Sequence, residues 1–179
     1  MNYTIKKSDV LYKGKVFDLK VDEIEYNSGN KANREVILHP GGAVVVGVTK
    51  ENKIVMVKQH RYPMNKILIE LPAGKLDKDE DPQTCASREL EEETGYRSNK
   101  LEKLGSIYTT PGYSSEELHI YVALDLAEGN HNREEGEKGM EIKEFSLEEI
   151  ENMVEENKIV DGKTISGIFL YSSWLKNQA

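Results

Sequence analysis

The chain has 179 residues, of which 37% are hydrophobic and 31% are charged. This length fits one domain or one domain with a small appendage, and the composition is too polar for a membrane protein. The formal charge of −8, from 32 acidic against 24 basic residues, argues against binding to a nucleic-acid backbone. A single cysteine, Cys85, excludes an intramolecular disulfide and predicts a cytoplasmic location.

The first forty residues predict a small antiparallel sheet that is separate from the rest of the chain. Between residues 15 and 38, apolar positions alternate with polar ones on both sides of turn-forming residues 27–30. The segment holds few large apolar residues, and an isolated small sheet is only marginally stable in water. We therefore expect residues 1–40 to pack on a second subunit, and residues 41–179 to form the main domain.

The main domain predicts a mixed sheet. Two valine-rich segments, residues 43–49 and 54–59, are separated by a polar turn and are typical of a β-hairpin. Further strands are expected at residues 67–71, 101–108 and 117–124, which have the same strand-like composition.

Helices are predicted by their end signals. Asp81, followed by proline, predicts the N-cap of a helix that Gly95 ends. Ser146 and Glu149 form a capping box for a second helix, and an apolar stripe predicts a last helix that begins at residue 161 or 164. The order of strands and helices indicates an α+β fold, with helices packed on a mixed sheet.

The first predicted helix carries a cluster of carboxylates. Glu89, Glu92 and Glu93 are spaced i, i+3 and i+4, so all three side chains project from one face. Like charges at this spacing lower helix stability by a few tenths of a kcal/mol per pair, about 0.2 to 0.5. A hard divalent cation with oxygen ligands, such as Mg²⁺, resolves the repulsion. Arg88 lies four residues before Glu92 and can pair with it.

The segment around this cluster matches the pattern G-x5-E-x7-R-E-U-x-E-E-x-G-U throughout, where U is a bulky apolar residue. This pattern is the Nudix box, and the chain resembles the Nudix hydrolases. Tyr96 is a mild departure, because Ile, Leu or Val is commoner at that position. The matching residues are Gly74, Glu80, Arg88, Glu89, Leu90, Glu92, Glu93, Gly95 and Tyr96.

The resemblance implies an α/β/α sandwich that hydrolyses a diphosphate linked to another group, with Mg²⁺, or Mn²⁺ as the alternative ion. The family's metal ligands fall on Glu89 and Glu93, with Glu92 in the same shell and the Ala73 carbonyl as a backbone ligand. Glu92 and Arg88 are expected to take part in catalysis. Bound metal ions neutralise phosphate oxygens and activate a water molecule, which is the chemistry that phosphoryl transfer requires.

A narrower resemblance, to the bacterial ADP-ribose pyrophosphatases, rests on Pro111, which lies sixteen residues after Gly95. Segments 34–36, 39–41, 59–61 and 70–74 also resemble that subgroup, in order and in spacing. The resemblance implies cleavage of ADP-ribose to AMP and ribose 5-phosphate by a homodimer that exchanges its N-terminal sheets. The alternatives are another nucleoside diphosphate sugar or dinucleotide (ADP-mannose, ADP-glucose, NADH or FAD), and an ADP-ribose sensor without turnover.

The same resemblance implies further site residues. Two arginines are expected to hold phosphate or ribose and two glutamates to flank the pocket, while Phe17 and Tyr113 stack on adenine, with core packing as the alternative for Phe17. The catalytic base is expected to be Glu137, with Glu135 as the alternative, in a loop that contains two glycines. The expected substrate-binding residues are Arg34, Arg61, Glu70, Pro111, Gly112, Glu116, Phe17 and Tyr113.

Overall fold

The computed structural model describes residues 2–130 and 139–178, which divide into two compact units. Unit 1 consists of Met1–Gly41 and Tyr108–Glu117, and unit 2 consists of Gly42–Ile107 and Leu118–Ala179. Residues 108–117, which the sequence analysis placed in the main domain, therefore belong to unit 1. Among the described residues, no helix is both long and apolar enough to cross a membrane.

Unit 1 is a three-stranded antiparallel sheet with the order β1-β2-β3. Its strands are β1 (Tyr3–Lys13), β2 (Asp18–Tyr26) and β3 (Lys31–Leu38). The expected turn between the last two is present, and Gly29 there has a left-handed φ of 86°. Strand β1 was missed because its side chains are almost all exposed, so no buried face marks it in the sequence.

Unit 2 is built around a mixed sheet with the order β12-β5-β4-β10-β9, and two short strands extend it. Strand β4 runs parallel to β10 and antiparallel to β5, so the predicted hairpin is present. Gly74 lies in β7, which pairs with β4. The strands are β4 (Gly42–Val48), β5 (Ile54–Arg61), β6 (Lys66–Glu70), β7 (Ala73–Lys75), β9 (Lys100–Tyr108), β10 (Glu117–Leu124) and β12 (Glu141–Phe145), and β8 (Tyr96–Arg97) pairs separately with β11 (Ala127–Glu128).

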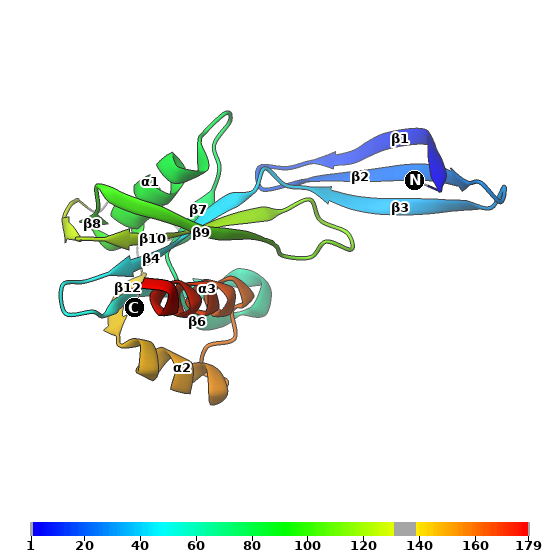
Figure 1. Ribbon diagram of the computed structural model, residues 1–179. Helices are drawn as coiled ribbons and strands as arrows, with labels where there is room; N and C mark the ends of the chain where they lie inside the picture. The colour runs from blue at the N-terminus through cyan, green and yellow to red at the C-terminus, as the bar shows by residue number, and fades with distance from the viewer. Residues whose placement is uncertain (1, 131–138, 179) are drawn as a thin grey trace. The chain divides into compact units, whose positions relative to one another are not determined.

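The helices cover both faces of this sheet, as Figure 1 shows for unit 2. On one face, α1 (Pro82–Thr94) packs Ala86 and Leu90 into one apolar core. On the other face, α2 (Leu147–Glu155) and α3 (Gly162–Gln178) contribute Ile150 and Ile168 to a second core. Unit 2 is therefore an α/β/α sandwich, as the sequence analysis expected.

The predicted helix ends are present. The Asp81 side chain accepts hydrogen bonds from the backbone nitrogens of residues 83 and 84, at 3.0 and 3.1 Å, and Gly95 closes α1 with a φ of 72°. The capping box of α2 forms in both directions between Ser146 and Glu149. Of the two starts proposed for α3, Asp161 is the cap, because its carboxylate accepts a hydrogen bond from Thr164 N at 3.0 Å.

Candidate functional site

Helix α1 directs two buried carboxylates at the backbone of β7. Glu89 and Glu93 are only 7% and 2% exposed. The Ala73 amide donates a hydrogen bond to Glu93 Oε2 at 3.1 Å, and a Cβ atom at Gly74 would collide with the Glu89 carboxylate. Glycine at this position therefore lets the Glu89 carboxylate lie directly against the strand.

Arg88 supplies the positive charge that these acids need. Its Nη1 donates to Glu89 Oε1 at 2.6 Å and to Glu92 Oε2 at 3.0 Å, which confirms the predicted pair with Glu92. Its Nε and Nη2 form a fork to both oxygens of Glu80, at 2.9 and 3.0 Å. These bonds, together with the hydrogen bond from the Asp77 amide, lower the pKa of Glu80 from 4.5 to about 2, and the bonds to the carboxylates raise the pKa of Arg88.

The residues of α1 and β7 fit a hard divalent cation in their chemistry. Glu89, Glu92, Glu93 and the Ala73 carbonyl offer only oxygen donors, which is the set that Mg²⁺ and Mn²⁺ prefer. No three His, Cys, Asp or Glu side chains converge into a ready metal cluster within the part of the chain that the structure describes. Because Arg88 bonds one oxygen of Glu89 and one of Glu92, its hydrogen bonds would compete with an ion for these carboxylates.

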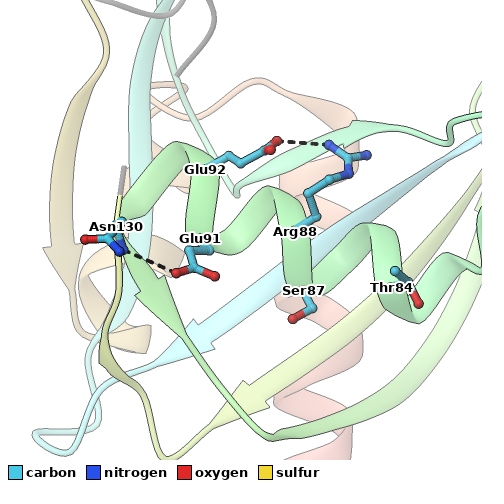
Figure 2. A pocket seen from close by; sticks show the side chains of 6 residues that line it. All are labelled: Thr84, Ser87, Arg88, Glu91, Glu92 and Asn130. Carbon is cyan, nitrogen blue, oxygen red and sulfur yellow. Dashed lines mark hydrogen bonds and ion pairs between the residues drawn. The ribbon is translucent and has the colours of Figure 1, made fainter. Parts of the chain in front are cut away.

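A surface pocket opens over the outer side of α1, next to the acidic cluster (Figure 2). Glu92 and Arg88 face each other on one side of the pocket, and Glu91 lies on the other side. There Glu91 Oε1 accepts a hydrogen bond from the backbone nitrogen of Asn130 at 3.2 Å. The pocket gives a ligand access to Glu92. It is lined by Thr84, Ser87, Arg88, Glu91, Glu92 and Asn130.

Arg61 and Glu70 form a second charged group at the ends of β5 and β6. Arg61 Nε and Nη2 donate to the two oxygens of Glu70 at 2.8 and 2.6 Å, and Lys163 Nζ also contacts Glu70. Burial works to raise the pKa of Glu70, but the bonds from Arg61 and the charge of Lys163 outweigh it and lower that pKa. Arg61 Nη1 takes no part in this pair, so that side of the guanidinium can serve a ligand.

The other expected substrate-binding residues lie in unit 1. Arg34 on β3 hydrogen bonds the Tyr26 hydroxyl, and its guanidinium carbon lies 5.9 Å from the centre of that ring. Glu116 accepts a hydrogen bond from Thr109 Oγ1 at 2.6 Å. Phe17 is 38% exposed, so the alternative that it belongs to a core is wrong within this chain. Pro111, Gly112 and Tyr113 form an exposed loop of this unit.

Some functional positions escaped the sequence analysis, and others cannot be placed. Glu135 and Glu137, the expected catalytic bases, lie outside the described residues. Lys163 was not singled out at all, and residues 161 and 164 were considered only as starts of a helix. A lysine between two candidate capping residues was the available signal, but its partner Glu70 is 93 positions away in the sequence.

Comparisons with known proteins agree with this geometry. The model of the NUDIX domain matches residues 38–165. An ADP-ribose pyrophosphatase of Bacillus subtilis (strain 168) is 42% identical over 92% of this chain and 89% of its own. A methanol dehydrogenase activator of Bacillus methanolicus is 41% identical over 90% and 88%. A crystal structure of an ADP compounds hydrolase has the same fold, with a TM-score of 0.88 and 21% identity, over 100% of this chain and 97% of that chain. The matched model covers most of the chain, which therefore belongs to the Nudix family.

Proposed function

We propose that this Nudix protein is a metal-dependent pyrophosphatase that hydrolyses ADP-ribose to AMP and ribose 5-phosphate. The observation that carries the proposal is the pair of buried carboxylates, Glu89 and Glu93, which face the backbone of Ala73 and Gly74. The similarity to an ADP-ribose pyrophosphatase over most of both chains supports the choice of substrate. In the reaction, water attacks one phosphorus and the bond from that phosphorus to the bridging oxygen breaks.

We assign Glu89, Glu93 and the Ala73 carbonyl to hold Mg²⁺ or Mn²⁺, with Glu92 in the same shell. A bound ion supplies charge neutralisation on the diphosphate and lowers the pKa of a coordinated water. Arg88 orients Glu89 and Glu92, because it donates a hydrogen bond to each of them directly.

The remaining roles concern the substrate and the proton. Arg61 donates from Nη1 to a phosphate oxygen while Glu70 fixes the rest of its guanidinium. Glu137 takes the proton from the attacking water, with Glu135 as the alternative. We keep six residues of unit 1 as substrate-binding groups, and Arg34→Ala is expected to raise KM. They are Phe17, Arg34, Pro111, Gly112, Tyr113 and Glu116.

The test is product analysis with and without metal. Wild-type protein with Mg²⁺ should convert ADP-ribose to AMP and ribose 5-phosphate, and EDTA should abolish the conversion. Glu93→Gln should lower kcat about a hundredfold or more, since loss of even a group behind a metal ligand costs up to that much. Glu151→Gln, on the exposed side of α2, is the control and should keep full activity. Full activity of Glu93→Gln would contradict its role in metal binding. Full activity of both single variants, Glu137→Gln and Glu135→Gln, would contradict the assignment of the base.

A second candidate is hydrolysis of a different nucleoside diphosphate compound. It is favoured by a GDP-mannose pyrophosphatase of Cronobacter sakazakii that is 35% identical over 74% of this chain and 73% of its own. A panel of ADP-ribose, ADP-mannose, ADP-glucose, NADH and FAD, compared by kcat/KM, separates the two candidates. Binding of ADP-ribose without turnover of any compound would indicate the sensor instead.

We also propose that the protein is a cytoplasmic homodimer whose partner chain covers unit 1. Strand β1 exposes large apolar side chains, including Ile5, Leu11 and Tyr12, which are 56%, 63% and 56% exposed. Such a surface is unfavourable in water unless another surface covers it. Light scattering should give twice the mass of the chain, and Leu11→Asp should shift it towards one chain. A single mass of one chain for the wild-type protein would contradict the proposal.

A further inference from the structure

The start of α3 holds two charged residues, Lys163 and Asp161, to which the reaction described above gives no role. Lys163 Nζ contacts Glu70 and lies 2.9 Å from Asp161 Oδ2. The Asp161 carboxylate also accepts from the Thr164 hydroxyl at 2.6 Å. The side chains of Lys163 and Glu70 are only 13% and 1% exposed, so the network is buried and its charges need one another.

The same turn of α3 also hydrogen bonds the backbone of the residue that follows Glu70. The Leu71 amide donates a hydrogen bond to Thr164 Oγ1 at 2.9 Å, in a buried position. One turn further on, Gly167 lets α3 approach closely, since a Cβ there would lie 2.6 Å from Leu71 Cδ1. Residues 70 and 71 are therefore fixed by α3 through a charge, a hydrogen bond and a packing contact.

The fixed segment leads directly into the metal-binding backbone. Pro72 accepts a hydrogen bond from Val45 N at 2.9 Å, and Ala73 donates to Glu93. Glu70 itself accepts hydrogen bonds from Nε and Nη2 of Arg61, as described above. A displacement of Glu70 would therefore reach both the arginine fork and the Ala73 carbonyl.

We propose that Lys163 is a positioning residue for diphosphate hydrolysis: through Glu70 it holds Arg61 and the segment of residues 70–73 in their working positions. This inference rests on the proposed function for its substrate, although the contacts that carry it do not depend on the substrate. Lys163 does not touch the reacting atoms. It acts by sharing the charge of Glu70, whose burial otherwise favours the neutral acid.

A double-mutant cycle tests the route through Glu70. Lys163→Met and Glu70→Gln should each lower kcat/KM for ADP-ribose about tenfold or more, as expected for a lost charged hydrogen bond. The kcat/KM of the double variant should be no lower than that of the less active single variant, because both changes break the same route. Multiplication of the two losses would overturn the proposal.

The pH profile distinguishes positioning from a loss of fold. Without Lys163, Glu70 loses a cation that lowers its pKa, so the acid limb of kcat/KM should move to higher pH in Lys163→Met. Lys163→Arg should restore the profile in large part. Lys158→Met removes an exposed pair with Glu156 just before α3 and should leave the profile unchanged. An unshifted acid limb in Lys163→Met would refute the role.

Amide hydrogen exchange tests, without any substrate, whether α3 holds the backbone of residues 69–73 in place. In the ligand-free full chain, Lys163→Met and Thr164→Val should each speed exchange in residues 69–73 more than in the rest of unit 2. Unchanged exchange in both variants would overturn the proposal. If wild-type protein releases no AMP from ADP-ribose, the proposed function is rejected, and the positioning role is judged by exchange alone.

Discussion

Arg88→Met removes the cation that three carboxylates share and keeps a side chain of similar length. In the wild-type protein this guanidinium donates to Glu80, Glu89 and Glu92 at 2.6 to 3.0 Å. Its loss leaves these carboxylates to repel one another, with Glu89 almost fully buried. We therefore expect a less stable protein, and one that depends more strongly on a divalent cation.

The magnitude follows from the pKa of Glu80, which is lowered from 4.5 to about 2 mainly by its bonds to Arg88, with a smaller share from the Asp77 amide. This difference corresponds to about 3 kcal/mol of unfolding free energy at neutral pH. Because the Arg88 side chain is 29% exposed, solvent screens part of it, and we expect about 2 kcal/mol. The contribution is complete above pH 4.5 and is lost as the pH falls towards 2, since the pKa is depressed in the folded state.

Urea unfolding followed by Trp174 fluorescence measures the effect, with Arg97→Met as a control on the exposed edge strand β8. The free-energy gap between wild type and Arg88→Met should be widest at pH 7 and should narrow between pH 5 and pH 3. Mg²⁺ at pH 7 should stabilise Arg88→Met more than wild type, because the ion replaces the lost charge. A gap that does not depend on pH, or that equals the effect of Arg97→Met, would refute the reasoning.

Three further predictions concern close contacts of unit 2. Gly74→Ala should lower metal-dependent turnover because the added Cβ displaces the Glu89 carboxylate. The expected loss is about tenfold, as for the loss of a group that supports a metal ligand, and unchanged turnover would contradict the contact. Burial, helped by nearby carboxylates, raises the pKa of the Cys85 thiol to about 12, so iodoacetamide at pH 8 should modify it slowly until urea unfolds the chain. Gly167→Ala should lower the unfolding free energy by about 1 to 3 kcal/mol, because its Cβ meets Leu71, and calorimetry measures the loss.

The parts of the fold that could be predicted are those whose signals are local. The cap at Asp81 and the capping box at Ser146 are encoded within a few neighbouring positions, and both helices begin where expected. In the valine-rich hairpin, all of β4 and the first four residues of β5 are apolar and buried, so the composition alone predicts these strands. Strands β7 and β12 were missed because they are short and have no buried residue, and they form by pairing with β4 and β5, respectively.

The site divides in the same way, by the distance in sequence between interacting groups. The spacing of Glu89, Glu92 and Glu93 and the pair of Arg88 with Glu92 lie within two turns of one helix, so the helical period alone predicts them. The contact between Lys163 and Glu70 joins positions 93 residues apart, and no period or cap relates them. Since a buried charge is tolerable only when it is paired, the burial of Glu70 itself requires such a partner. The carboxylates proposed to hold the metal are thus readable from a motif, whereas the groups that fix Glu70 follow from the contact of α3 with the end of β6.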